Sequence, residues 1–318
     1  MFDRIVVVTR RTRLDDLIAR FNTRGQARFY IEHSAQGAGS FAEYEAEHDA
    51  YERALDVVLR ATDAGIPRHV IDRGLVPTYT FGDRDVVVAV GQDGLVANVA
   101  KYALERPLIG VNPDPVRFDG VLLPFLADQC AVAVASVLEE RAATRRVTLA
   151  EATLNDGQRL LAFNDLFIGA RTHVSARYAL QHGSVREAQS SSGVLVSTGA
   201  GSTGWISSVF NMAAGVTTLA GGACGRPIRL EWNDPRLLFA VREPFVSRHS
   251  SANHIAGLLE ANDTLVLQSM MPTDGVIFSD GVESDFLHFD AGALASIGAS
   301  RRFASLVVPG GRAAGGRR

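Results

Sequence analysis

Val-Val-Val-Ala-Val-Gly-Gln-Asp-Gly, residues 86 to 94, is the stretch that decides the fold of this 318-residue chain. Its five apolar residues predict a buried strand, the glycines predict a turn, and Leu95 to Leu104 continues with apolar residues at helical spacing. A strand, a glycine turn and a helix start together can bind a phosphate, because glycine lets backbone N–H groups approach closely. Asp93 adds a carboxylate, which suits holding a metal ion or accepting a proton from a substrate hydroxyl. The same tetrapeptide also fits a tight turn in which Asp93 only caps the helix.

The composition excludes several classes of protein. A formal net charge of −3 gives no overall basic field, so neither nucleic acid nor a membrane surface is an expected partner. The longest nearly uncharged stretch, residues 193–225, is rich in Gly, Ser and Thr and does not predict a membrane span. A predicted strand starts almost at the first residue, so no signal peptide is expected. Cys130 and Cys224 form no disulfide framework, and we expect a cytoplasmic protein.

The first 125 residues alternate strands and helices. Strands are predicted at 4–9, 69–72, 85–90 and 107–111, with amphipathic helices between them. This alternation predicts a parallel sheet with helices on its faces, whose ligands bind at the carboxyl ends of the strands. Asp93 and Asn112 both lie at such ends.

The chain changes character after a helix predicted over about 124–141. Asn155-Asp-Gly157 predicts a hairpin, and most of the later predicted strands lack long helices between them. We therefore expect an antiparallel, β-rich second domain. A helix is expected after Gly204, and the Gly- and Arg-rich tail from Pro309 is expected to be disordered.

Two polar clusters stand out in the second half. Asn164-Asp165 interrupts an apolar strand pattern, which marks either a bulge or a ligand contact. Ser197-Thr-Gly-Ala-Gly-Ser-Thr-Gly204 joins a strand to a helix and offers backbone donors and hydroxyls to a phosphate or a ribose. The alternative interpretation of this loop is a flexible turn.

Taken in order, the Gly-x-Asp-Gly turn, the Asn-Asp pair and Gly-Ser-Thr resemble the NAD kinase family, whose hallmarks are GGDG, NE and TGSTAY. The chain looks most like the mitochondrial-type branch of that family. The resemblance spans residues 6 to about 298, with supporting segments at 109–115, 164–169, 191–193, 238–244 and 289–296. The resemblance implies a Rossmann-like α/β domain over 1–140 and a β-sandwich-like, dinucleotide-binding domain over 141–290. It also implies that 291–318 returns to the first domain before the tail.

The resemblance also implies an activity. Members transfer the γ-phosphate of ATP to the 2′-hydroxyl of the adenosine ribose of NAD, giving NADP, with Mg²⁺ accompanying the ATP. They act as homodimers or homotetramers. NAD and ATP would then be the small-molecule partners of this chain.

Carried over by position, the resemblance gives Asp93 the catalytic role beside the accepting hydroxyl. The residues that it implies in substrate binding are Gly91, Gln92, Gly94, Asn112, Asn164, Asp165, Ala200, Gly201, Ser202, Thr203, Trp205 and Asp280. No metal site built from protein side chains is predicted, since His249 and His254 have no third ligand near them in the sequence.

The chain departs from the family pattern at several positions: Asn164-Asp165 stands where the family has NE, and Ala200-Gly-Ser-Thr-Gly-Trp205 stands where it has TGSTAY. Gln92 replaces the second glycine of GGDG, Leu95 replaces the threonine that follows, and Trp205 replaces the tyrosine of TGSTAY. Lys101 is the only lysine, which excludes a Walker-A loop, and it is expected on the helix surface. These departures bear on the acceptor more than on the reaction class.

Two other functions fit the same residues. A kinase of the same fold acting on a sugar, a polyol or a lipid would share the glycine turn, and a lipid would require an apolar tunnel in the β-rich domain. A nucleotide-binding sensor that no longer catalyses would fit the altered turn.

Overall fold

The computed structural model of this chain describes residues 1–33 and 40–310, and the predicted tail is thus described only at Pro309 and Gly310. The chain divides into two compact units: one holds residues 1–145 together with the segment from Ser305 onward, and the other holds Arg146–Ala304. The predicted boundaries at 140 and 290 precede these two divisions, which fall inside the long strands at 143–154 and 294–308.

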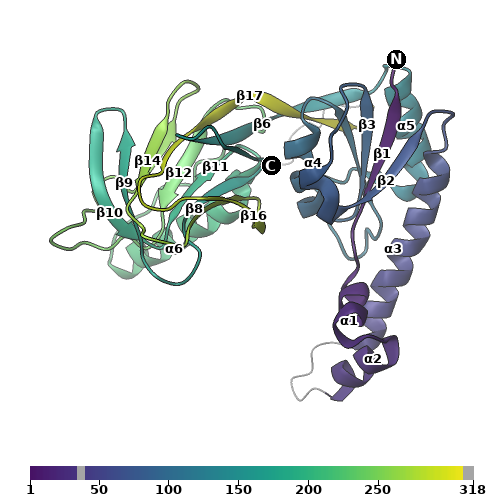
Figure 1. Cartoon of the computed structure of the whole chain (residues 1–318), viewed down its shortest axis with the longest axis horizontal. Coiled ribbons are helices and arrows are strands. Elements are labelled where there is room, and N and C mark those ends of the chain that lie inside the picture. The colour runs from purple at the N-terminus through teal and green to yellow at the C-terminus, as the bar shows by residue number, and fades with distance from the viewer. Residues whose placement is uncertain (34–39, 311–318) are drawn as a thin grey trace. The chain divides into compact units, whose positions relative to one another are not determined.

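The first unit is built around a parallel sheet. Its strands are β1 (Arg4–Thr9), β2 (Arg68–Asp72), β3 (Asp85–Val90), β4 (Pro107–Asn112) and β5 (Phe125–Leu126), and its helices are α1 (Arg13–Phe21), α2 (Arg24–His33), α3 (Phe41–Ala61), α4 (Asp93–Ala103) and α5 (Cys130–Leu138). β1 lies between β2 and β3 (Figure 1). β4 pairs with β3 and with β5, and all of these pairings are parallel. Every residue of β3 is buried, as its unbroken apolar run predicts.

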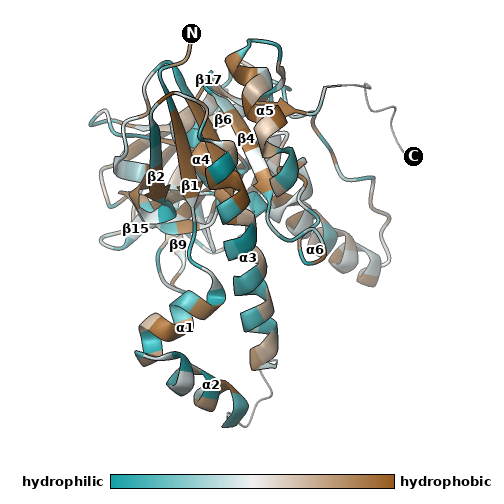
Figure 2. Ribbon diagram, turned by 90° about the vertical axis from the view of Figure 1, so that its right-hand side faces the viewer, coloured by the Kyte–Doolittle hydropathy of each residue, from teal (hydrophilic) through white to brown (hydrophobic). Residues whose placement is uncertain are grey.

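The helices of this unit follow the amphipathic pattern where the sequence shows one. Thr12 forms a capping box with Asp15 at the start of α1, and Ser40 caps α3 by accepting a hydrogen bond from the Ala42 N–H. α2 was not predicted, and it packs with α1 and α3 around Leu14, Ile31 and neighbouring apolar residues. In Figure 2, β1 and β4 are largely brown whereas α3 carries many teal residues, as expected of core strands and a surface helix.

The prediction for the exposure of Lys101 was wrong. Lys101 was expected on the surface of α4, but its side chain is buried, with 3% of the residue exposed, and its ammonium lies 5.2 Å from the Tyr102 ring centroid. The reason is that α4 is buried over most of its circumference, from Leu95 to Lys101.

The second unit is antiparallel. Its strands are β6 (Ala143–Leu154), β7 (Arg159–Ala162), β8 (Asp165–Ala170), β9 (Ala176–His182), β10 (Val185–Ser191), β11 (Val194–Ser197), β12 (Leu237–Val241), β13 (Ala256–Leu259), β14 (Leu265–Ser269), β15 (Gly275–Ser279), β16 (Val282–His288) and β17 (Leu294–Val308), and its helix is α6 (Trp205–Leu219). One sheet has the order β13-β12-β11-β8-β15-β16, and the other contains β10-β9-β14-β17 with β6 and β7. β17 then continues into the first unit, where Ser305 and Leu306 pair in parallel with β4.

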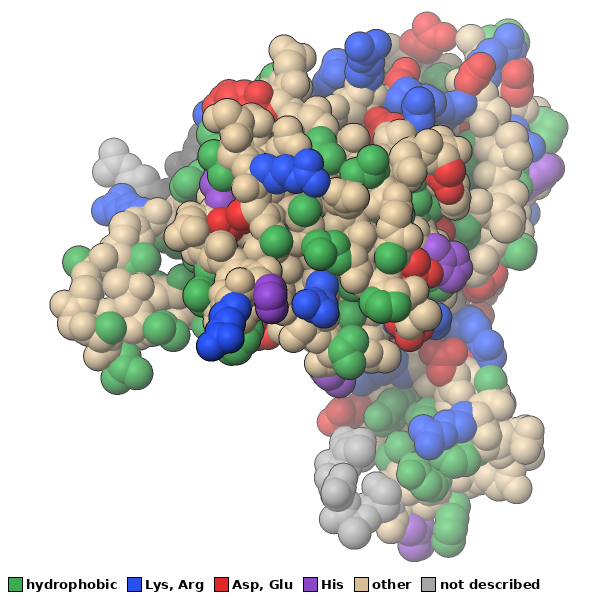
Figure 3. All heavy atoms as spheres, turned by 60° about the vertical axis from the view of Figure 1, so that its left-hand side comes forward, with side chains coloured by type: hydrophobic (Ala, Val, Ile, Leu, Met, Phe, Trp, Pro, Cys, Tyr) green, Lys and Arg blue, Asp and Glu red, His purple; other side chains and the backbone are tan. Residues whose placement is uncertain are grey.

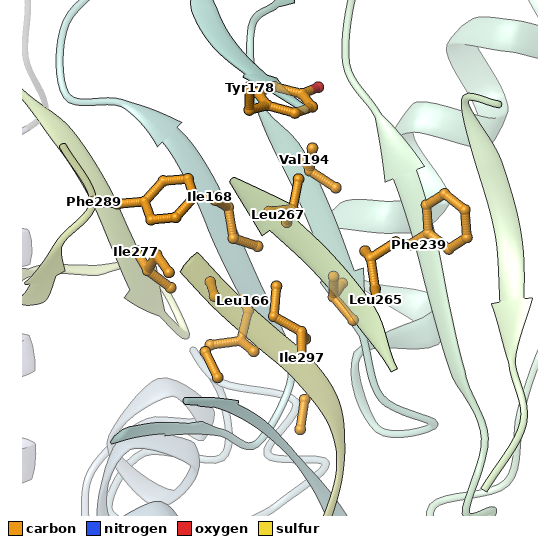
Figure 4. Packing of buried hydrophobic residues seen from close by; sticks show 14 of the residues in the cluster. Leu166, Ile168, Tyr178, Val194, Phe239, Leu265, Leu267, Ile277, Phe289 and Ile297 are labelled. Carbon is orange, nitrogen blue, oxygen red and sulfur yellow. The ribbon is translucent and has the colours of Figure 1, made fainter. Parts of the chain in front are cut away.

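The two sheets of the second unit enclose one apolar core. Leu166 and Ile168 from β8 meet Leu265 and Leu267 from β14 and Ile297 from β17, and Figure 4 shows these side chains pointing into the space between the sheets. Alternate residues of each strand line this core, which is the pattern of a β-sandwich. The predicted fold class, a parallel α/β domain and a β-sandwich-like domain, is confirmed.

Among the described residues, no helix has both the length and the apolar character needed to cross a membrane. The face drawn in Figure 3 carries basic (blue) and acidic (red) side chains interspersed with uncharged ones.

Candidate active site

The predicted site residues fall into two groups, one in each unit. In the first unit they surround residues 91–94, here named the Gly91–Gly94 turn. The Gly91 N–H donates to the Val111 carbonyl oxygen at 3.2 Å, which ties the end of β3 to the end of β4. A Cβ on Gly91 would lie 2.9 Å from Leu95 Cδ2, so it would require the Leu95 side chain to shift, whereas a Cβ on Gly94 would meet nothing within 4 Å.

The hydrogen bonds at the start of α4 do not agree with the alternative in which Asp93 only caps this helix. Gln92 is the N-cap residue and its side chain makes no capping hydrogen bond. Asp93 is the first helical residue, and its Oδ1 accepts a hydrogen bond from the Leu122 backbone N–H at 2.7 Å. Asp93 therefore does not cap its own helix. Among the described residues its Oδ2 has no hydrogen-bond partner, and the residue is half-buried.

Asn112 shapes the loop that supplies this Leu122 N–H. Its Nδ2 donates to the Phe118 carbonyl oxygen at 2.9 Å, and its Oδ1 accepts from the Asp114 N–H at 3.0 Å. Gly120 follows with φ +65°, and a Cβ there would lie 2.5 Å from Asn112 Nδ2. Both polar atoms of Asn112 are thus engaged within the loop, which gives Asn112 a positioning role that the sequence did not reveal.

In the second unit, the predicted site residues lie around the break between β7, which ends at Ala162, and β8, which begins at Asp165. The sequence predicted that Asn164-Asp165 interrupts an apolar strand pattern, and in the structure Phe163 and Asn164 leave the strand conformation. Asp280 is the cause: its Oδ2 accepts from the Phe163 N–H at 3.0 Å, and its Oδ1 accepts from the Asn164 N–H at 2.6 Å. Asp280 itself has φ 54° and donates its own N–H to the Asp165 carbonyl oxygen at 2.9 Å. Asp280 therefore holds the segment that carries Asn164 and Asp165.

Asp165 is a buried carboxylate. The residue is 8% exposed, and its Oδ1 has no hydrogen-bond partner among the described residues. Burial raises the pKa of Asp165 to about 7; a hydrogen bond from Ser197 lowers it in part, and the negative charge of Asp280 raises it further. A buried acceptor without a donor is unfavourable in a folded protein, so this oxygen is suited to a hydroxyl donor from a ligand.

The loop after β11 packs tightly against this segment. Thr198 Oγ1 donates to the Phe163 carbonyl oxygen at 2.5 Å and accepts from the Gly201 N–H at 3.2 Å. A Cβ on Gly201 would lie 2.2 Å from the Asn164 carbonyl oxygen, so only glycine fits. Ser202 is buried and donates its hydroxyl to the Gly199 carbonyl oxygen at 2.7 Å, while Thr203 is exposed and Ala200 half-buried. Of the hydroxyls predicted to bind a ligand, that of Ser202 is engaged inside the loop.

Trp205 opens α6 beside a pocket of about 720 Å³. Its ring stacks on Phe167, with centroids 5.7 Å apart and planes at 9°, and Phe167 stacks in turn on Phe278. The Arg242 Cζ lies 5.2 Å from the Trp205 ring centroid. The pocket is lined by Phe167, Ala170, Arg171, Thr172, His173, Val174, Ser192, Trp205, Arg242, Glu243, Val276, Phe278 and Glu283.

This pocket contains residues that the sequence reasoning missed. Phe167 lies two positions after Asp165 on β8, so both side chains project from the same face of the sheet. That spacing is the signal that could have found Phe167. The same spacing of two positions separates Phe278 from Asp280 in the sequence. The volume and the stacked aromatic rings suit a planar ligand group.

No arrangement of three or more His, Cys, Asp or Glu side chains able to hold a metal ion occurs within residues 1–33 and 40–310. The substrate-binding roles inferred for the residues of both groups stay predictions.

No protein-family model matches this chain. It is similar to the NAD kinase of Chlorobaculum tepidum, with 26% identity over 139 residues, which is 43% of this chain and 46% of that protein. It is also similar to the NAD kinase of Chlorobium phaeobacteroides, with 28% identity over 141 residues, 43% of this chain and 47% of that protein. Each match spans about half the length of the relative.

The structural similarity extends over almost the whole chain. A crystal structure of yeast NADH kinase complexed with NADH matches 97% of this chain and 84% of its own, with a TM-score of 0.54 and 15% identity. An NAD kinase from Archaeoglobus fulgidus in complex with ATP matches 96% of this chain and 93% of its own, with a TM-score of 0.50 and 19% identity. This chain therefore has the fold of the NAD and NADH kinase structures.

Proposed function

We propose that this protein is a kinase that transfers the γ-phosphate of ATP, bound as its Mg²⁺ complex, to the 2′-hydroxyl of the adenosine ribose of NAD, giving NADP. Asp93 carries the proposal. Its carboxylate follows a buried strand and a glycine turn, is held by the Leu122 N–H at 2.7 Å, and keeps Oδ2 without a partner among the described residues. In this proposal Oδ2 orients the accepting hydroxyl and takes its proton as the phosphate is transferred.

The second unit supplies dinucleotide binding in this proposal. Asp165 presents a buried oxygen without a donor, which suits a ribose hydroxyl. Trp205 offers a stacked aromatic surface beside a pocket of nucleotide size. The two bacterial relatives are NAD kinases. One of the structural neighbours is a complex with NADH, and the other is a complex with ATP. The acceptor could thus be oxidised or reduced, and both forms belong in the test.

The oligomeric state, the compartment and the branch of the family belong to the same proposal. The sequence resemblance supports a homodimer or homotetramer and a protein of the mitochondrial-type branch. Cys130 and Cys224 are free thiols, in keeping with the proposed cytoplasmic location.

The lipid-kinase alternative is disfavoured by the lining of the pocket in the second unit. A lipid would require an apolar tunnel, but Arg171, His173, Arg242, Glu243 and Glu283 are among the residues that line this pocket. A planar polar ligand agrees better with that lining.

The test is to incubate the purified protein with ATP, MgCl₂ and either NAD or NADH, and to measure NADP or NADPH with a dehydrogenase specific for it. We expect product with at least one acceptor and none without ATP. Absence of product with both acceptors would overturn the proposal, and binding of NAD without turnover would then support the sensor alternative.

A further inference from the structure

Arg10 follows β1 directly and lies against the Gly91–Gly94 turn, although no role was inferred for it from the sequence. A Cβ on Gly91 would stand 3.3 Å from Arg10 Cδ and 3.5 Å from Arg10 Nε. The proximity arises because β1 and β3 are neighbouring parallel strands, so their carboxyl ends meet at one edge of the sheet. The side chain of Arg10 is 8% exposed.

The guanidinium of Arg10 is fixed from several sides. Its Nη2 donates to Glu47 Oε1 at 3.0 Å and its Nη1 to the Arg11 carbonyl oxygen at 3.0 Å. Its Cζ lies 5.1 Å from the Tyr51 ring centroid and 5.8 Å from that of Phe118. The Tyr51 hydroxyl in turn accepts from the Arg10 N–H and donates to the Val90 carbonyl oxygen, just before the turn.

The ion-paired side chains of Arg10, Arg13 and Glu47 together carry a net positive charge. Glu47 is 1% exposed and receives hydrogen bonds from both Arg10 and Arg13. Burial raises the pKa of Glu47, but these two guanidinium groups outweigh burial and hold the pKa below its ordinary value. Glu47 is therefore ionised at neutral pH, and two cations face one anion.

Two observations indicate that donors at this edge of the sheet can bind an anion. First, Arg10 Nε is buried and has no hydrogen-bond partner among the described residues. Second, α4 begins at the same turn, and its N-cap residue Gln92 makes no side-chain capping bond. A buried charged donor and an uncapped helix N-terminus both favour an acceptor with negative charge.

We propose that Arg10 binds a phosphate group of a nucleotide at the Gly91–Gly94 turn through its Nε–H. Arginine suits this place because its planar guanidinium stays charged and can keep Glu47 on one edge while another edge meets a phosphate oxygen. This proposal rests on the proposed function. It adds to that function a cationic side chain that contacts a phosphate, a role that was not expected of Lys101. The phosphate could belong to the triphosphate of ATP or to the diphosphate of NAD, and the experiment separates these two sources.

The test compares Arg10→Lys with Arg13→Lys. Lysine at position 10 keeps a positive charge facing Glu47 but removes the Nε–H. Arg13 pairs with the same carboxylate and has no contact with the turn among the described residues, so it is the matched control. Binding of ATP with Mg²⁺, of NAD and of adenosine is measured by calorimetry, and a thermal unfolding scan checks that each variant folds.

For Arg10→Lys we expect the affinity for either ATP or NAD to fall about tenfold, since a charge-assisted hydrogen bond is lost. The ligand that weakens identifies the phosphate. Adenosine, which has no phosphate, should bind as it does to the unchanged protein, and Arg13→Lys should change no affinity by more than about twofold. Unchanged binding of both ATP and NAD to Arg10→Lys would overturn the proposal. So would an equal loss for adenosine, because that would reveal a purely structural role.

A measurement on the unchanged protein covers the case in which Arg10→Lys does not fold. The Arg10 Nε–H is identified by NMR through its contacts with the Tyr51 and Phe118 rings, and ATP, NAD and adenosine are added in turn. We expect its resonance to shift with ATP or with NAD but not with adenosine, and no shift with either would overturn the proposal. If the unchanged protein forms NADP and this resonance never moves, only the role of Arg10 fails. If it binds neither ATP nor NAD, both proposals fail.

Discussion

Asp93 is positioned for chemistry by a backbone amide 29 residues further along the chain, that of Leu122. This hydrogen bond uses one oxygen of the carboxylate and turns the side chain away from its own helix N-terminus. A carboxylate held in this way keeps its second oxygen for another partner.

For Asp93→Asn we expect kcat for NADP formation to fall about a hundredfold or more, because the amide cannot accept the hydroxyl proton. The fold should persist, since the amide oxygen can still accept from the Leu122 N–H. Steady-state kinetics and a thermal unfolding scan measure the two effects. Asp114→Asn is the control, because Asp114 pairs with Arg117 in the neighbouring loop and should change kcat by less than about threefold. Near-normal turnover by Asp93→Asn would contradict the assignment.

Asp165 makes the free energy of unfolding depend on pH. Its pKa is raised by burial to about 7 in the folded protein, against about 3.9 when unfolded, so the folded state binds the proton more tightly. The resulting stabilisation is complete below about pH 4 and is lost as pH rises through about 7. We expect the free energy of unfolding of the unchanged protein, relative to Asp165→Asn, to fall by about 1.4 kcal/mol per pH unit over this range.

Urea unfolding at several pH values measures this difference. Ser197→Ala is the companion variant: it removes the hydrogen bond that lowers the pKa of Asp165, so the decline in stability should extend to higher pH. Parallel stability curves for Asp165→Asn and the unchanged protein would contradict the prediction.

At the scale of elements, the loop from Thr198 to Gly204 is determined by close backbone packing. Gly199 and Gly201 lie so near the carbonyl oxygens of Glu231 and Asn164 that a Cβ would stand 1.8 and 2.2 Å from them. The sequence suggested glycines that open the backbone to a phosphate. In the structure these two glycines let the loop pack on its neighbours.

Gly201→Ala should therefore lower the free energy of unfolding by about 2 kcal/mol or more, because the added methyl displaces the loop. Gly215→Ala is the matched control on the adjoining helix α6, where a Cβ meets nothing within 4 Å. That variant should be stabilised by up to about 1 kcal/mol, since alanine favours a helix. Chemical denaturation checks both, and equal effects of the two substitutions would show that the loop can move aside.

On the scale of the whole molecule, one strand contributes to two separate cores. On β17, Ile297 is fully buried in the sandwich core of the second unit, and Val307 is buried in the core of the first. The stability of each unit should therefore depend on a different part of the same strand.

Ile297→Ala should weaken hydrogen-exchange protection in β8, and Val307→Ala should weaken it in β3, each by about 2 kcal/mol or more. The opposite unit should keep its protection in each case. Hydrogen exchange followed by mass spectrometry measures both strands in one experiment, and each variant serves as the control for the other. Equal loss in both strands with either substitution would mean that the two units unfold together.

The sequence by itself determined the fold class and the order of most elements. Hydrophobic periodicity and the spacing of glycines are local properties, and they predicted β1 and β3 with the bounds that the structure has. α2 was missed, whereas Asn164-Asp165 marked the place where the strand pattern over 159–168 is interrupted. Asp93, Asp165 and Trp205 could be chosen from the sequence because the short motifs that contain them follow one another in the order that the NAD kinase family shows.

The tertiary structure alone decided which atoms these residues meet. The Leu122 N–H that holds Asp93, the Asp280 carboxylate that interrupts β7 and β8, and Arg10 beside Gly91 are contacts between residues far apart in the chain. A backbone amide has the same chemistry at every non-proline residue, so no sequence pattern marks the one that will bind a carboxylate. Packing brings such groups together, and only packing could show them.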